Sequence, residues 1–107
     1  AKYEIERVGQ MQIEQRRILR NFITGKYYDY IEALNVIEIR SNALENQRER
    51  IEIVQHQFTR GEAEADQLMQ LENSLYSLEE SFLKSRIFAM KLKSELELFT
   101  RPVDSEY

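Results

Sequence analysis

Few side chains in this 107-residue chain have the chemistry of a catalytic or metal site. His56 is the single histidine and cysteine is absent, so a zinc or haem site would need carboxylates alone. Glu45, Glu49 and Glu52 lie at helical spacing, as the acids of any charged helix do. The Glu-x-x-His pattern of di-iron bundles is missing, because Ile53 stands three residues before His56. The sequence predicts no metal, no cofactor and no enzyme activity.

Aromatic and basic side chains are the residues with which a protein would bind nucleic acid. Tyr27, Tyr28 and Tyr30 form a cluster that could stack on bases, but amphipathic packing at a helix interface is the commoner use of such rings. The 19 acids and 15 bases give a net charge of −4, and the arginines are interleaved with glutamates. Such a surface does not attract phosphate backbones, so we expect no nucleic-acid partner.

Composition favours one all-α domain over residues 1–107. Three glycines and one proline supply too few turns for an all-β fold, whereas Glu, Lys, Arg, Leu and Gln are typical of exposed helices and coiled coils. No apolar run approaches the roughly 20 residues needed to cross a bilayer, so we expect no membrane insertion by this segment.

The apolar residues of the C-terminal half follow a heptad pattern. This pattern predicts a helix over about residues 62–99, stopped before Pro102, with a frayed tail over residues 100–107. The ten heptad positions from Leu68 to Phe99 form what we call the seam, and Ser85 is the one polar residue among them. The residues expected to pack against other helices are Leu68, Leu71, Leu75, Leu78, Phe82, Leu92 and Leu96.

A second apolar row flanks that seam at a spacing of seven residues. It consists of Met69, Tyr76, Leu83 and Met90. The apolar surface is therefore broader than the seam of a two-stranded coiled coil, which predicts contact with more than one neighbour.

The N-terminal half predicts a second long helix over about residues 3–59. Tyr30, Ile37, Leu44 and Phe58 lie in one heptad register, and apolar residues upstream keep its phase through Gly25. A glycine inside a helix costs only about 1 kcal/mol relative to alanine. The alternative is a three-helix bundle in which the first helix ends at Gly25.

A reversal of the chain is predicted at about residues 60–62. Gly61 can cap the first helix at positive φ, while Glu62 and Glu64 suit the first turn of the second helix. The predicted fold is thus a long antiparallel helical hairpin that resembles a coiled coil. The alternative is one continuous helix of about 95 residues that dimerises as a rod.

Three stretches give the chain a resemblance to a known family, the TolC-like outer-membrane efflux proteins, of which it looks like one periplasmic helical hairpin. The resemblance rests on their order and separation, and it covers roughly residues 3–99. They are residues 3–7 leading into the KYYDYIEAL segment at 26–34, the QFTRG segment at 57–61, and the LMQLENSL segment at 68–75 followed by Leu78 and Leu83.

The resemblance implies a periplasmic export duct in which every helix packs against a neighbour on each side and the hairpin tip meets an adaptor protein. The implied tip residues are Arg60, Gly61, Glu62, Asp66 and Gln67. The family tends to have an apolar residue directly after the glycine and an acid six residues after it. This chain has Glu62 and Gln67 there, with Asp66 one position early.

The expected function is therefore that of a hairpin in the periplasmic part of an outer-membrane export duct, which acts through self-association and tip contact with an adaptor. The alternative is a free-standing coiled-coil scaffold, chaperone or adaptor that binds a partner helix and could be cytoplasmic.

Overall fold

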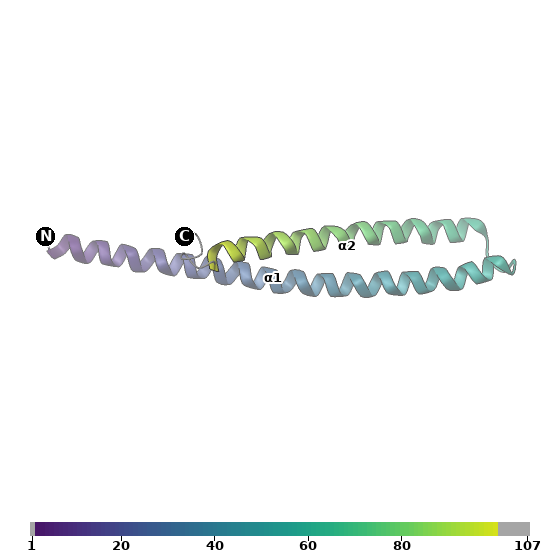
Figure 1. Ribbon diagram of the computed structural model, residues 1–107, viewed down its shortest axis with the longest axis horizontal. Coiled ribbons are helices and arrows are strands. Elements are labelled where there is room, and N and C mark those ends of the chain that lie inside the picture. The colour runs from purple at the N-terminus through teal and green to yellow at the C-terminus, as the bar shows by residue number, and fades with distance from the viewer. Residues whose placement is uncertain (1, 101–107) are drawn as a thin grey trace, which may run out of the picture.

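Two long helices make up nearly all of the structure, a computed structural model that describes residues 2–100. Helix α1 spans Lys2–Thr59 and helix α2 spans Ala65–Thr100, and the two run antiparallel side by side (Figure 1). The molecule measures 89 × 30 × 15 Å. The predicted all-α antiparallel hairpin is confirmed. The expected frayed tail lies outside the described residues, apart from Thr100, which ends α2.

Helix α1 runs through Gly25 without a break. The three-helix alternative is therefore wrong, and the reversal after Thr59 also excludes one continuous helix. A Cβ atom built on Gly25 meets no atom within 4 Å, so the glycine serves no close approach. The surrounding helix-forming residues and the packing of α1 against α2 outweigh the small cost of one interior glycine.

The C-terminus of α1 ends in a Schellman motif. Gly61 has a φ of 76°, in the left-handed region that glycine adopts without a Cβ penalty. Its N–H donates to the Phe58 carbonyl at 3.0 Å, and the Glu62 N–H donates to the Gln57 carbonyl at 2.8 Å. These two bonds satisfy carbonyls that the helix itself leaves unpaired. The glycine cap predicted from the sequence is thus confirmed.

Helix α2 begins at Ala65, three residues later than expected. Glu62 is the last member of the cap of α1, so it cannot also start α2, and Glu64 precedes the helix as well. The Glu64 carbonyl accepts the first bond of α2, from the Leu68 N–H at 3.3 Å. Only Asp66 remains as an acid in the first turn, where the helix dipole favours it.

The seam between the helices is formed by residues at alternating steps of three and four along each helix. Ala33, Ala89 and Leu92 form a buried cluster against which Tyr30 and Ile37 pack. The other buried apolar side chains are Leu44, Ile51 and Val54 of α1. Two of the three buried residues of this cluster are alanines, and small side chains at a helix–helix contact permit a short distance between the helices.

Pairing of the helices ends well before the start of α1. The Phe22 and Phe99 rings meet edge to face with centroids 5.5 Å apart, and Lys26 Nζ lies 2.9 Å from Glu95 Oε2. Residues 2–21 of α1 project beyond the end of α2 as a single helix (Figure 1), and we call them the N-terminal extension.

Alanine substitutions at Gly25 and Gly61 are expected to change stability in opposite directions. Gly25→Ala should raise the free energy of unfolding by about 1 kcal/mol, because the helix interior there has room for a methyl group. Gly61→Ala should lower it by about 1 kcal/mol, because alanine is strained at positive φ. Urea denaturation followed by circular dichroism measures both. Stabilisation by Gly61→Ala would contradict the cap.

Candidate protein-interaction surfaces

The hairpin turn gathers the predicted tip residues at one end of the molecule. Arg60, Gly61, Glu62, Asp66 and Gln67 are all exposed there. The turn lies at the opposite end of the paired helices from the end of α2 (Figure 1). Glutamates and an aspartate outnumber the single arginine, so this end is mostly acidic and polar. It can form hydrogen bonds and ion pairs with a partner, and the nearest exposed large apolar side chains are Phe58 and Met69.

The seven helix-packing residues predicted on α2 all lie on the side that faces α1. Leu92 is buried and the other six are half-buried, because two helices alone leave the edges of the seam open to solvent. These six are Leu68, Leu71, Leu75, Leu78, Phe82 and Leu96.

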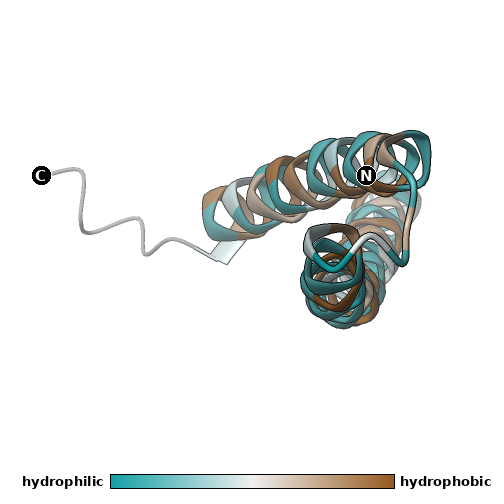
Figure 2. Ribbon diagram, turned by 90° about the vertical axis from the view of Figure 1, so that its right-hand side faces the viewer, coloured by the Kyte–Doolittle hydropathy of each residue, from teal (hydrophilic) through white to brown (hydrophobic). Residues whose placement is uncertain are grey.

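The flanking apolar row of α2 is uncovered in the hairpin. Met69, Tyr76, Leu83 and Met90, which we call the outer row, are 55–65% exposed. Each residue follows a seam residue by one position, which places it about 100° further around the helix. Hydrophobic segments recur along both helices when the hairpin is viewed from its turn (Figure 2). A long exposed apolar row is typical of a surface that another protein covers.

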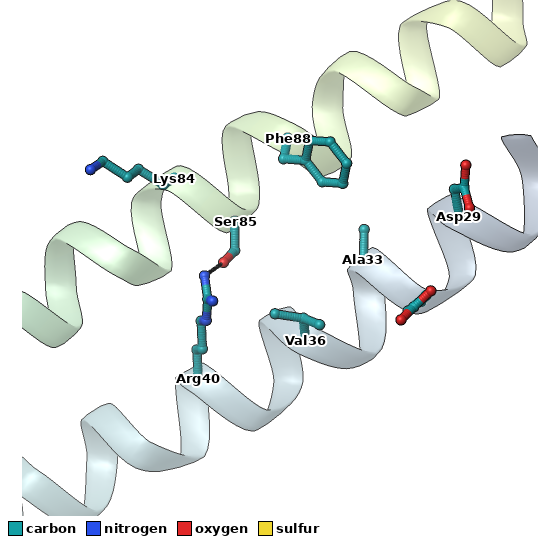
Figure 3. A pocket seen from close by; sticks show the side chains of 8 residues that line it. Asp29, Ala33, Val36, Arg40, Lys84, Ser85 and Phe88 are labelled. Atoms are coloured by element: carbon teal, nitrogen blue, oxygen red, sulfur yellow. Dashed lines mark hydrogen bonds between the residues drawn. The ribbon is translucent and has the colours of Figure 1, made fainter.

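Two polar side chains meet inside the seam. Arg40 Nη1 donates a hydrogen bond to Ser85 Oγ (Figure 3) and another to the Ser81 carbonyl at 3.0 Å. Ser85 Oγ in turn donates to the Ser81 carbonyl at 2.9 Å. Ser85 is only 7% exposed. A charged donor to buried acceptors forms stronger hydrogen bonds than a neutral one, so this contact links the two helices at one level.

A second polar side chain of α1 reaches α2 in the same way. Gln47 Nε2 donates to the Leu71 carbonyl at 3.2 Å. Arg40 and Gln47 occupy seam positions seven residues apart, between Ile37, Leu44 and Ile51. We did not predict either contact from the sequence, although the three-and-four spacing would have placed both residues in the seam. A polar residue, Ser85, at one of ten seam positions of the second helix was the other indication that a polar side chain of α1 lies opposite it.

An open groove lies beside the Arg40 contact (Figure 3). Its volume is about 510 Å³, and both helices line it. Residues of both charge signs and apolar residues share the lining, including Asp29, Glu32, Val36, Arg40, Lys84 and Phe88. The groove is shallow and mixed in character, so it suits a side chain of a packed protein neighbour better than a small substrate that must be enclosed.

Ion pairs join the helices at the edges of the seam. Lys26 Nζ lies 2.9 Å from Glu95 Oε2, and Arg48 Nη2 lies 3.6 Å from Glu79 Oε1. All four side chains retain solvent contact, so each pair contributes little to stability. Opposite charges at the edges of a helix pair generally favour one alignment of the helices over others.

The tyrosine cluster divides between the seam and the surface. Tyr30 packs against the buried cluster, as expected of an interface residue. Tyr27 and Tyr28 stay exposed and meet edge to face, with ring centroids 6.1 Å apart. His56 lies exposed in the last turn of α1.

Three further findings concern metal sites, membrane spans and known proteins. Within residues 2–100, no group of three or more His, Cys, Asp or Glu side chains is placed to hold a metal ion. Neither helix of the described chain combines the length and apolar content that a bilayer span requires. No protein-family model, curated protein or solved structure matches the chain.

Proposed function

We propose that this chain is a periplasmic hairpin of a TolC-like outer-membrane export duct, with a non-catalytic role. In this proposal the two helices form part of the wall of the duct, and the turn contacts a periplasmic adaptor protein. The chain works by packing: copies or further hairpins lie on both sides of it, and cargo passes through the space that the assembled helices enclose.

The observation that carries this proposal is that α2 is apolar on two faces. One face packs on α1 and the other carries the outer row, which is exposed along most of the helix. A helix in a closed ring needs a neighbour on each side, whereas a simple hairpin needs only one apolar face. The outer row is the surface that such a second neighbour would cover.

The turn suits the second part of the proposal by its position. It lies at one end of the 89 Å hairpin, where a partner can reach the exposed Glu62 and Asp66 without disturbing the seam. The polar and acidic side chains there favour a partner surface with basic residues and hydrogen-bond donors. This differs from an apolar tip contact, and the adaptor is expected to differ accordingly.

Site-specific photocrosslinking in living cells tests this proposal with the intact native protein. A photoreactive residue replaces Glu62 at the turn, and in a matched variant it replaces Glu97, which is also exposed but lies near the far end of α2. We expect the protein in the outer-membrane fraction. The Glu62 probe should form an adduct with a periplasmic protein anchored in the inner membrane, and the Glu97 probe should not.

Two results would refute the export-duct role. The first is a protein that fractionates with the cytoplasm, and the second is a turn probe that never reaches an inner-membrane-anchored partner. The gene provides an independent check, because a duct subunit also needs strand-like alternating segments and a second copy of the hairpin pattern around this one.

A second candidate function, a free-standing coiled-coil scaffold, chaperone or adaptor, is favoured by a different observation. The N-terminal extension is a single helix with exposed apolar residues, so it can bind one partner helix without any ring. Cytoplasmic fractionation together with a soluble protein partner would support this second candidate.

A further inference from the structure

The charged residues of α2 are segregated by sign along the helix. Before Leu83 the helix has four acids and no base, and after Leu83 it has four bases and two acids. A parallel copy in register would set each charge beside its own like, whereas an antiparallel copy sets the acidic part against the mostly basic part. The ten residues are Asp66, Glu72, Glu79 and Glu80 in the first part, and Lys84, Arg86, Lys91, Lys93, Glu95 and Glu97 in the second.

A charged column runs directly beside the outer row. It consists of Glu72, Glu79, Arg86 and Lys93, which recur every seven residues. Each of them follows a member of the outer row by three positions, so the column and the row share one face of α2. The two acids lie toward the turn and the two bases toward the far end of the helix. Packing against α1 leaves the outer row exposed, so this face is open to a second molecule.

We propose that a second copy of the chain covers the outer row, with the two α2 helices packed antiparallel about a two-fold axis near Leu83. Leu83 then meets its equivalent in the other copy. Tyr76 and Met90 are each seven residues from Leu83, so Tyr76 of one copy lies level with Met90 of the other. A two-fold contact of this kind uses the same surface on both copies and closes at two.

The same axis pairs opposite charges across the interface. Glu79 and Arg86 lie on opposite sides of Leu83 at four and three residues, and Glu72 and Lys93 lie at eleven and ten. Each acid of one copy is therefore within about one residue, or roughly 1.5 Å, of the level of a base of the other. One axis thus serves both the apolar contacts and four ion pairs.

The other six charged residues of α2 place no like charges at one level. Glu80 of one copy lies level with Arg86 of the other, because each is three residues from Leu83. The remaining five are level with uncharged residues. Asp66 is level with Thr100, Lys84 with Phe82, Lys91 with Leu75, Glu95 with Leu71 and Glu97 with Met69. The charge complementarity therefore holds when every charged residue of the helix is included.

The dimer is a property of the free chain, and the inference does not rest on the export-duct role. In a duct, a neighbouring hairpin would take the place of the second copy on the outer row. One helix per copy makes a small interface, so the dimer should dissociate at low micromolar concentration. The antiparallel arrangement sets the two turns at opposite ends of the dimer.

Sedimentation and small-angle X-ray scattering on residues 1–107 test the dimer directly. In the high-micromolar range we expect twice the monomer mass. The maximum dimension should rise from the 89 Å of the hairpin. We expect it to reach roughly 120 Å, because the N-terminal extensions of the two copies project in opposite directions from the axis. A wild-type chain that stays monomeric at those concentrations would overturn the proposal.

Leu83→Gln and Phe88→Gln form a matched pair that tests the face. The two side chains are 55% and 56% exposed in the hairpin, but Phe88 lies five residues further along, about 140° around the helix. Leu83→Gln should weaken association by about 10-fold or more, because it removes two leucines from the centre of the interface. Phe88→Gln should dimerise like the wild type. Equal weakening by both variants would refute the assigned face.

Exchange of two charges tests the orientation. Lys93→Glu should weaken association by about 5-fold at low ionic strength, because it turns both attractions with Glu72 into repulsions. The double variant Glu72→Lys, Lys93→Glu should restore the affinity of the wild type, because each position again faces its opposite charge. Within residues 2–100 neither side chain forms an ion pair, so the hairpin keeps its own ion pairs.

The rescue identifies a contact between copies. Glu72 and Lys93 are roughly 30 Å apart along one helix, so they cannot compensate each other within a single chain. Circular dichroism of the variants at low micromolar concentration should show unchanged helix content, which separates loss of dimer from loss of fold. A double variant that associates as weakly as Lys93→Glu would overturn the antiparallel arrangement.

Discussion

Replacing Leu92 with alanine is expected to lower the free energy of unfolding by about 2–4 kcal/mol. Leu92 is 4% exposed and packs with Ala33 and Ala89 in the buried cluster. Leu92 is the only large side chain among the three buried residues of the cluster, so its truncation leaves a space that Ala33 and Ala89 cannot fill. A hairpin of two helices has little stability in reserve, and a loss of this size should make the variant largely unfolded at moderate temperature. Urea denaturation followed by far-ultraviolet circular dichroism measures the change.

Leu83→Ala is the matched control, since it makes the same change on the same helix. Leu83 belongs to the outer row and is 55% exposed. In the isolated chain the variant should change stability by less than about 0.5 kcal/mol. Within a larger assembly the result should differ, because an outer-row contact with a neighbour would be weakened. Equal losses for both variants in the isolated chain would contradict the assignment of the seam.

The second large effect is expected at Arg40. Arg40→Asp should destabilise the hairpin by about 2–4 kcal/mol, because a carboxylate cannot donate hydrogen bonds to Ser85 Oγ and the Ser81 carbonyl. The new negative charge would also lie near that carbonyl oxygen in a partly buried seam. Thermal and urea unfolding of the variant measure the loss.

Arg40→Leu distinguishes two contributions of Arg40 to stability, the hydrogen bonds of its guanidinium and the packing of its aliphatic stem. Leucine suits a seam position, and replacing a partly buried charge with a packed apolar residue is often nearly neutral, so we expect a change within about 1 kcal/mol of the wild type. If both variants lose the same stability, the aliphatic stem of Arg40 would account for its contribution, and the polar contacts would not.

Much of the fold follows from the heptad pattern and one glycine. The registers of Tyr30 to Phe58 and of Leu68 to Leu96 indicate two amphipathic helices, and positive φ at Gly61 lets the chain reverse between them. The start of α2 was placed too early, because helix-dipole reasoning put Glu62 and Glu64 in its first turn. Glu62 instead belongs to the cap of α1, because its N–H donates to the Gln57 carbonyl. Residue preferences alone do not show whether Glu62 ends α1 or begins α2.

The polar seam contacts were harder to predict. Arg40 and Gln47 look like solvent-facing residues by type, and only their pairing with α2 explains them. Which residues meet across the seam depends on how the two helices are aligned along their axes. That alignment involves residues far apart in the sequence, so local patterns do not determine it. The tip residues were placed at one end of the hairpin from the sequence, but their partner depends on a second molecule. The function therefore stays a proposal that rests on the resemblance and on the exposed outer row.

The Arg40 contact also fixes how far the helices can slide along one another. A wholly apolar heptad seam tolerates a slip of seven residues, because each leucine then meets the next. Such a slip would set the Arg40 guanidinium against Leu78 or Leu92 in place of Ser85. The contact thus favours one register of the two helices over registers shifted by seven residues. Together with the short turn, this contact sets where α2 stops along α1, and so how much of α1 is left free for another molecule.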